Sequence, residues 1–285
     1  MATTILRVNT PLMLTSLAYV LPTLLVLLLA QRALHRLCAR AVGDGGATRI
    51  VVAAETFGTF LIAAAAAGSV RGESLLVDLQ WLAVFGLGGM LAFELAAWAG
   101  VRVLAHGGLA REIRAGNVAA ATLTAGHVLA TGILAASLFR GDSWDDLLLA
   151  TGFFALSQVS LHALVWLFRA LTTYDDEAQV MEHNVAAGLA HAGVSVAMAL
   201  LIAHAGDGAY VDLATSLGSY ALALGEGLAF YVVRQLLVSG VLLGLRPTLR
   251  GGALDRAIGE RADVGAGALE AASYVAMALV VRSLG

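Results

Sequence analysis

The chain contains eight long apolar segments, and this pattern limits the fold more than any other feature of the sequence. The segments lie at about 12–34, 48–69, 77–104, 115–139, 144–171, 183–204, 212–243 and 262–283. A helix of about 20 apolar residues crosses the hydrocarbon core of a bilayer. The whole chain is 59% hydrophobic and 13% charged, whereas soluble domains carry about 25% charged residues. We therefore expect an all-α polytopic membrane bundle of eight transmembrane helices, with the lipid bilayer as its solvent.

Basic residues alternate between the two sides of this predicted bundle. The loops after the first, third, fifth and seventh segments, with the adjoining helix ends, contain Arg32, Arg36, Arg40, Arg49, Arg102, Arg111, Arg114, Arg169, Arg246, Arg250, Arg256 and Arg261. The opposite side contains Arg7, Arg71, Arg140 and Arg282. Because arginine accumulates in cytoplasmic loops, both termini are predicted to lie on the non-cytoplasmic side. The net charge of −3 gives no indication of nucleic acid binding.

Short sequence matches in the same order divide the chain into two halves. Arg32-Ala33-Leu34 corresponds to Arg169-Ala170-Leu171, and Leu91-Ala92-Phe93 corresponds to Leu228-Ala229-Phe230. We expect two tandem four-helix units, 1–141 and 142–285. An even number of helices in each unit makes the two units parallel, related by an axis along the membrane normal.

A six-residue motif recurs at the starts of apolar segments. His183-Asn184-Val185-Ala186-Ala187-Gly188 has a near copy from Gly116 to Ala121, a looser copy from Ala262 to Gly267, and a weak copy from Ile50 to Glu55. With this motif, the chain resembles the bacterial inner-membrane proteins grouped as domain of unknown function 350. The resemblance implies four-helix units whose second and fourth helices begin with an Asn-rich step, a location in the bacterial inner (plasma) membrane, and envelope-associated roles. It implies no enzymatic activity.

The polar residue of this motif has two interpretations. Asn117, Asn184 and Asp263 can cap helix starts by accepting a hydrogen bond from a backbone N–H. The small residues that follow then let neighbouring helices approach closely. In the other interpretation, several such helix starts meet and form an ion or headgroup site.

Ionisable residues at membrane depth are the candidate functional groups. They are Glu55, Glu94, His127, His162, His191, Glu226, Arg234 and Glu270. A charge at the centre of a membrane helix costs about 2.5–3.5 kcal/mol on insertion scales, and such residues commonly mark function. Thr124, His191 and Glu270 each lie seven residues after the polar residue of the motif, and residues at this spacing share a helix face. We expect these three side chains to meet Glu55 in one polar centre, with Glu94, Glu226 and Arg234 completing a charge network.

Three interpretations of these groups stay open. They form a structural hydrogen-bond network, a proton or small-cation pathway, or a metal site. No His/Glu pair has metal-ligand spacing among them, so no metal is expected. The chain lacks the His-Glu-x-x-His helix, the Gly-x-Ser-x-Gly elbow and the phosphate-binding loop, so we expect neither an enzyme nor a cofactor.

The predicted function is a channel or transporter for protons or a small cation. The alternative is a non-catalytic membrane scaffold whose arginine-rich loops dock a soluble cytoplasmic partner of the envelope stress response. An oligomer is compatible with either function.

Overall fold

The computed structural model describes residues 10–37, 45–71, 74–104, 108–208, 210–248 and 250–284, without the side chains of residues 10–18 and 37. All secondary structure in these ranges is helical. The helices are α1 (Thr10–Leu37), α2 (Gly46–Ala67), α3 (Leu75–Leu104), α4 (Leu109–Arg114), α5 (Val118–Leu138), α6 (Trp144–Arg169), α7 (Asp176–Met181), α8 (Val185–Ala205), α9 (Leu213–Gln235), the π-helical continuation η1 (Leu236–Leu242), α10 (Ala253–Gly259) and α11 (Val264–Leu284).

Seven of these elements are long and apolar enough to cross a membrane: α2, α3, α5, α6, α8, α9 with η1, and α11. They coincide with seven of the eight predicted segments, so a multi-pass membrane protein is confirmed. The first predicted segment is the helix α1, but α1 is not among the seven candidate spans found in the described residues. The eighth span and the division into two four-helix units at residue 141 stay predictions.

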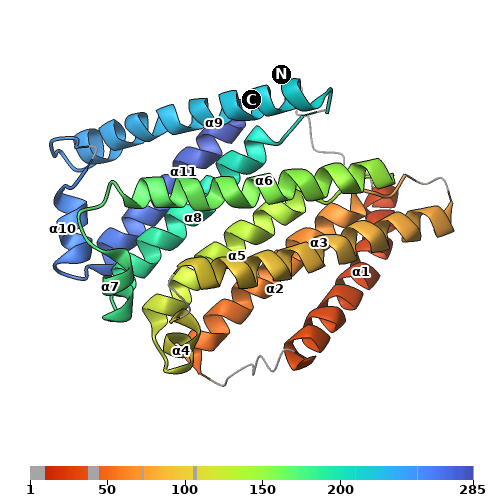
Figure 1. Cartoon of the computed structure of the whole chain (residues 1–285), viewed down its shortest axis with the longest axis horizontal. Helices are drawn as coiled ribbons and strands as arrows, with labels where there is room; N and C mark the ends of the chain where they lie inside the picture. The colour runs from red at the N-terminus through yellow and green to blue at the C-terminus, as the bar shows by residue number, and fades with distance from the viewer. Residues whose placement is uncertain are drawn as a thin grey trace.

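Four helices form a row through the middle of the molecule. They follow one another in the order α2, α5, α8, α11, and each packs closely on the next (Figure 1). Small residues permit this close packing. For example, a Cβ atom on Gly126 of α5 would lie 2.3 Å from the Cα atom of Ala192 of α8. Because lipid tails supply no hydrophobic drive for association between helices, close van der Waals packing of this kind helps to hold the row together.

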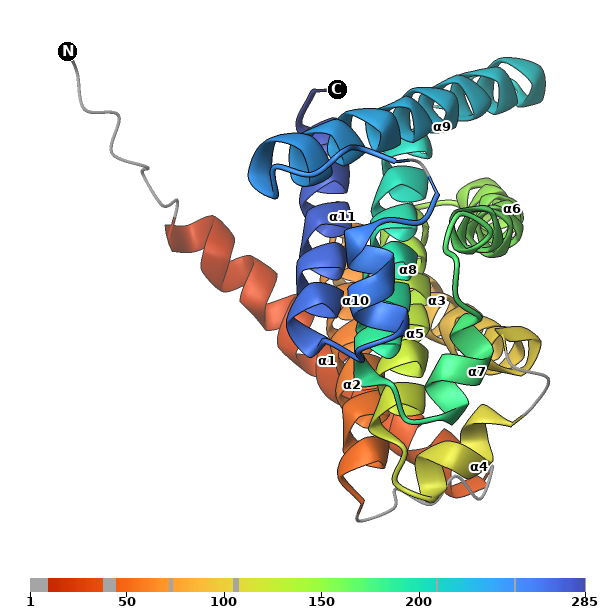
Figure 2. The same ribbon diagram turned by 90° about the vertical axis from the view of Figure 1, so that its left-hand side faces the viewer.

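The remaining long helices each cover a part of this row. α3 packs on α2 and α5, α6 packs on α5 and α8, and α9 packs on α8 and α11. α1 packs on α2 and α3 and leans away from the rest of the bundle (Figure 2). As a result, α5 and α8 are the most enclosed helices, whereas α9 and α11 are largely exposed.

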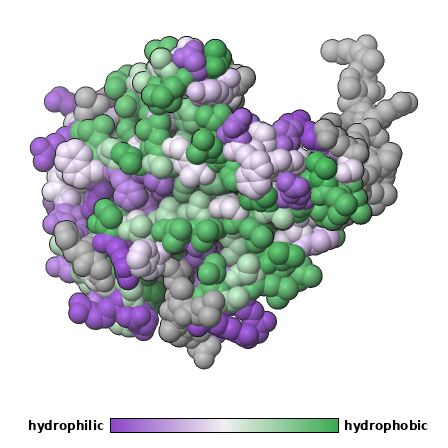
Figure 3. All heavy atoms as spheres, turned by 45° about the vertical axis from the view of Figure 1, so that its right-hand side comes forward, coloured by the Kyte–Doolittle hydropathy of each residue, from purple (hydrophilic) through white to green (hydrophobic). Residues whose placement is uncertain are grey.

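The outer surface suits lipid rather than water. Large apolar side chains are exposed on most of the long helices, including Leu76, Leu148, Trp166, Leu222 and Leu279, and apolar residues spread widely over the face shown in Figure 3. In a soluble protein so much exposed apolar area would promote aggregation. In a bilayer it is the expected contact with acyl chains.

Candidate functional site: polar clusters between the helices

The polar residue of the recurring motif caps three helices, as predicted. The side-chain oxygen of Asn117 accepts a hydrogen bond from the backbone N–H of Ala120 at 3.0 Å. Asn184 accepts from Ala187 at 3.2 Å, and Asp263 accepts from Ala266 at 3.1 Å. This geometry satisfies N–H groups that have no partner within the helix.

The two asparagines also fasten each helix start to a later part of the chain. The side-chain amide of Asn117 donates to the backbone carbonyl of Val180 in α7 at 2.9 Å. That of Asn184 donates to the carbonyl of Ile258 in α10 at 2.8 Å. Both asparagines are buried. The motif therefore has a structural role in the described fold, and a role in ion or headgroup binding is untested.

The assignment of the weak fourth copy of the motif, from Ile50 to Glu55, to a helix start is wrong. α2 begins at Gly46 and its N-cap is Gly45, so Ile50 and Val51 lie one turn inside the helix. The residue that corresponds to Asn117 at a helix start is therefore Gly45. The match was misleading because runs of valine and alanine fit any position of an apolar helix.

A histidine and two glutamates converge between α1, α2 and α3. The Nε2 atom of His35 lies 3.2 Å from a carboxylate oxygen of Glu55. One ligand atom each from His35, Glu55 and Glu94 lie within 4.8 Å of one another. The amide of Gln31 donates to Glu94 at 3.4 Å. Gln31 and His35 are four residues apart on one face of α1, and both are buried.

His35 and Gln31 were not among the residues predicted from the sequence. Both lie near the end of the first apolar segment, where they could be taken for headgroup-level residues. Their spacing of four residues, opposite two membrane-level glutamates, is the signal that could have identified them.

Arg234 and Glu270 form a second cluster, between α9 and α11. The guanidinium lies 3.1 Å from the Glu270 carboxylate, and the Arg234 side chain is 2% exposed. Arg234 also donates to the hydroxyl of Ser273 at 2.6 and 3.0 Å and lies 3.9 Å above the ring of Tyr274. The ring of Tyr231 stacks on the ring of Tyr274, with their centroids 5.9 Å apart. This cation is therefore fully partnered within the protein.

A cavity of about 40 Å³ lies next to this second cluster. Glu270, Tyr274, Gln235 and Asp255 are among the residues that line it. Such a space is large enough for water molecules. It connects the Glu270 carboxyl in the bundle with Asp255, which lies in the short helix α10 outside the membrane spans.

Three histidines make up a third group, between α5, α6 and α8. The rings of His127 and His162 meet edge to face with their centroids 5.1 Å apart. His127 occupies space left by Gly100, where a Cβ atom would lie 1.9 Å from its Nε2 atom. His191 is 2% exposed, and neither of its ring nitrogens has a hydrogen-bond partner among the described residues. Buried polar atoms are normally satisfied, so this imidazole is an exception among the described residues.

The predicted single polar centre is wrong. Glu55 lies in α2 and Glu270 in α11, at opposite ends of the four-helix row, with α5 and α8 between them. Each joins its own cluster, and His191 belongs to the third group. The spacing of seven residues did place these side chains on equivalent faces, but neighbouring helices in a row turn the same face toward different partners.

Glu226 does not join the predicted charge network. It lies in α9, is exposed, and has no hydrogen bond or ion pair with the described residues. Glu94 contacts Gln31, and Arg234 contacts Glu270. Glu94 and Arg234, the other two members of the predicted network, thus belong to different clusters. Glu226 faces outward from the bundle.

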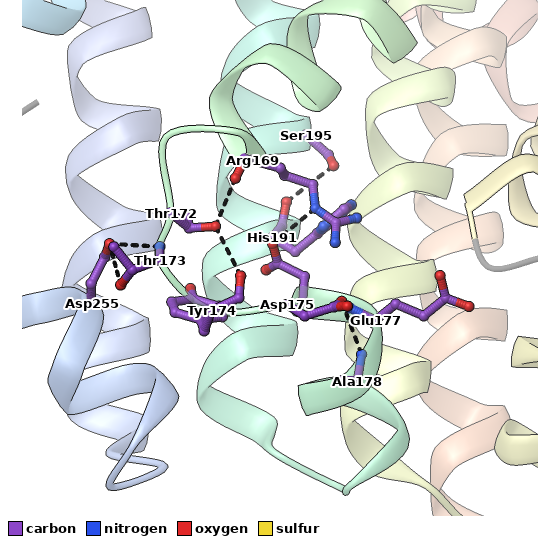
Figure 4. Close-up of polar contacts among 11 residues, drawn as sticks. Arg169, Thr172, Thr173, Tyr174, Asp175, Glu177, Ala178, His191, Ser195 and Asp255 are labelled. Atoms are coloured by element: carbon purple, nitrogen blue, oxygen red, sulfur yellow. Dashed lines mark hydrogen bonds and ion pairs between the residues drawn. The ribbon is translucent and has the colours of Figure 1, made fainter. Parts of the chain in front are cut away.

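Polar residues also gather where α6 leaves the membrane (Figure 4). Arg169 donates to the carboxylate of Asp176 at 2.9 Å, and the backbone N–H of Thr173 donates to Asp255 at 3.2 Å. Burial raises the pKa of Asp176, although the positive charge of Arg169 opposes this shift. Burial likewise raises the pKa of Asp255, against the hydrogen bonds from Thr173.

Comparison with known proteins identifies the family of the chain through its second half. The model of the domain of unknown function 350 matches residues 142–284, which include the Arg234–Glu270 pair, His191 and the caps of α8 and α11. The chain belongs to the DUF350 family. No curated protein and no solved structure matches the chain. The family assignment confirms the resemblance predicted from the Asn-containing motif, whereas the match to the second half alone leaves the tandem duplication a prediction.

Proposed function

We propose that this DUF350 protein binds protons or a small cation within the bacterial inner membrane and conducts them across it. The observation that carries this proposal is the convergence of His35, Glu55 and Glu94, whose ligand atoms lie within 4.8 Å of one another. Imidazole nitrogens and carboxylate oxygens hold protons and also bind small cations such as Zn²⁺ and Mn²⁺.

The charge balance of this cluster separates it from the Arg234–Glu270 pair. Two carboxyl groups and one imidazole supply the ligand atoms of this cluster, and the two carboxyl groups lie close together. An arginine already neutralises Glu270. Like charges disfavour simultaneous ionisation, so a proton or a cation stabilises the first cluster when it occupies the space between the carboxylates.

The position of the cluster supports transfer across the bilayer. Glu55 lies nine residues inside α2, which corresponds to about 14 Å along the helix. Intramembrane carboxylates at this depth are usual members of ion and proton pathways. The buried imidazole of His191 and the cavity beside Glu270 are further polar positions in the bundle. Neither nitrogen of this imidazole has a hydrogen-bond partner in the part of the chain that the structure describes.

Flux measurements in proteoliposomes test the proposal. Purified protein is reconstituted with a pH-sensitive dye or a divalent-cation dye inside the vesicles, and flux is driven by a valinomycin potential or a cation gradient. We expect flux in the natural protein and its loss in Glu55→Gln and in Glu94→Gln. Glu226→Gln is the matched control, because it makes the same isosteric change at membrane depth on an outward-facing residue. Flux that is unchanged in both cluster variants, or absent from the natural protein with every ion, contradicts the proposal.

A second candidate function is that of a docking platform. Arg111, Arg114, Arg256 and Arg261 are exposed on or beside α4 and α10, which precede α5 and α11 and therefore share one end of the bundle. A soluble acidic partner of the envelope stress response would be attracted to this surface. Neutralising the four arginines should abolish co-purification of such a partner without reducing membrane insertion.

A further inference from the structure

The cluster between α1, α2 and α3 brings one nitrogen ligand and two oxygen ligands together from three separate helices. His35 lies on α1, Glu55 on α2 and Glu94 on α3, and one ligand atom from each lies within 4.8 Å of the other two. His35 and Glu94 are buried, at 8% and 7% exposure. Metal sites are recognised in a sequence by close spacing of ligands along the chain, and this set has no such spacing. Only the packing of the three helices reveals it.

The distances within the cluster suit a small metal ion. Nitrogen and oxygen ligands lie about 2.0–2.2 Å from a zinc ion, so two ligands in tetrahedral geometry are about 3.3–3.6 Å apart. The Nε2 atom of His35 and a carboxylate oxygen of Glu55 are 3.2 Å apart, close to this spacing. A small movement of the Glu94 side chain brings in a third ligand, because its oxygen lies no more than 4.8 Å from the other two ligand atoms. A hydrogen bond between His35 and Glu55 explains the first distance but not the approach of Glu94 from a third helix.

A fourth side chain orients one of these ligands. The amide of Gln31 donates to Oε1 of Glu94 at 3.4 Å, and Gln31 is buried one turn before His35 on α1. Carboxylates that bind metals are commonly held by hydrogen bonds of this kind. Gln31 is therefore a positioning residue of the cluster and not a ligand.

The mixture of ligand atoms distinguishes between classes of cation. Mg²⁺ and Ca²⁺ take oxygen ligands, whereas an imidazole nitrogen suits Zn²⁺, iron and nickel, and carboxylate oxygens also suit Mn²⁺. Soft ions such as Cu(I) select sulfur ligands, and this set consists of nitrogen and oxygen. One imidazole with two carboxylates therefore favours a divalent transition metal ion.

We propose that His35, Glu55 and Glu94 form a site for a divalent transition metal ion of the Zn²⁺ class, and that the bound ion joins α1 to α2 and α3. The inference rests on the proposed function, which assigns ion binding to the same cluster, and it narrows the ion from a proton or any small cation to this class. Three protein ligands leave a fourth position for water. Since α1 packs on both α2 and α3, an ion with one ligand from each helix links all three.

Equilibrium binding to the purified chain tests this site without a flux measurement. The chain carries an affinity tag that lacks histidine, is stripped with a chelator in detergent micelles, and is titrated with Zn²⁺ in competition with a fluorescent zinc chelator. We expect one Zn²⁺ per chain. Co²⁺ and Mn²⁺ should compete for the site, whereas Mg²⁺, Ca²⁺ and Na⁺ at millimolar concentration should not. Displacement of Zn²⁺ by equal concentrations of Mg²⁺ or Ca²⁺ would overturn the choice of ion class.

Variants of the cluster identify the ligands. His35→Ala and Glu55→Gln should each weaken Zn²⁺ binding by about 100-fold or more, and Gln31→Leu by about tenfold, since loss of a residue that orients a ligand typically has an effect of that size. His204→Ala in α8 and Glu226→Gln in α9 are the matched controls. They remove an imidazole and a carboxylate elsewhere in the bundle and should leave the affinity unchanged. Equal losses in the controls, or unchanged affinity in both cluster variants, would refute the site.

X-ray absorption of the natural chain covers the case in which a variant fails to fold. At the zinc edge we expect nitrogen and oxygen ligands, with the scattering of one imidazole ring and none from sulfur. Cys38 follows His35 by three residues in the sequence, so Cys38→Ser is a further test and should leave the affinity unchanged. Sulfur scattering, or loss of binding in this variant, would overturn the assignment of the ligands.

The two proposals for this cluster can fail separately. If Zn²⁺ binds through these residues but proteoliposomes show no flux of any ion, the proposed function fails and the metal site stands. If proton flux depends on Glu55 and Glu94 but the chain binds no transition metal ion, the metal site fails and the proposed function stands.

Discussion

The buried pair of Arg234 and Glu270 makes a quantitative prediction about stability. Glu270→Ala removes the only carboxylate that contacts Arg234 among the described residues. The guanidinium keeps its hydrogen bonds to Ser273 and Gln235 and its position over Tyr274, but it is left charged and 2% exposed. Loss of one partner from a buried pair typically costs about 3–5 kcal/mol. We expect the free energy of unfolding to fall by that amount.

The double variant separates the loss of the pair from the cost of an isolated charge. Arg234→Met with Glu270→Leu replaces both groups by apolar side chains, and such replacements of buried pairs are often neutral or stabilising. The double variant should therefore be more stable than Glu270→Ala by about 3 kcal/mol or more.

Unfolding in mixed micelles with increasing SDS measures these differences. Asp142→Ala is the control, since Asp142 pairs with Arg71 at 2.6 Å but the two side chains are 39% and 58% exposed. An exposed pair contributes about 0–1 kcal/mol. If Glu270→Ala and Asp142→Ala lose the same stability, the electrostatic reasoning about burial is refuted.

Three further predictions concern the helix caps, the buried imidazole of His191 and pH. Asn184→Ala should cost more stability than Asp263→Ala, roughly 2–3 against 1 kcal/mol, because Asn184 also satisfies the buried Ile258 carbonyl; equal losses in SDS titrations would contradict this. His191→Leu should raise stability by about 1–3 kcal/mol, since its buried nitrogens have no partner among the described residues; a decrease would show that a bound water or ligand stabilises the ring. Burial raises the pKa of Asp255, so its contribution is full below its unfolded-state pKa of about 3.9 and is lost as pH rises through the higher folded-state pKa. Asp255→Asn should remove that loss, and melting temperatures between pH 3 and 8 that fall equally in both chains would refute the assignment.

The membrane fold was predictable because a bilayer imposes a length and a composition on every span. Seven apolar segments became helices of the expected extent, and the Asn-containing motif located the starts of α5 and α8. Those signals are local in sequence. A cap requires only its own helix, so three capping residues could be assigned without knowledge of the packing.

The arrangement of the polar groups was less predictable, for a physical reason. Periodicity gives the face of a helix on which a residue lies, but not the helix that covers this face. Glu270 and His191 occupy equivalent positions on their helices. Glu270, however, meets Arg234 of α9, whereas His191 lies in α8, which packs on α5 and α6. His35 was not predictable from local spacing, because its partner Glu55 lies on another helix.

The asparagine caps imply an order of events during synthesis. Asn117 is satisfied by a carbonyl 63 residues later, and Asn184 by one 74 residues later. Neither bond can form until the following hairpin has left the ribosome and entered the bilayer. Each newly inserted segment therefore completes the hydrogen bonds of an asparagine cap before it. The fold is stabilised progressively from the N-terminal to the C-terminal helices.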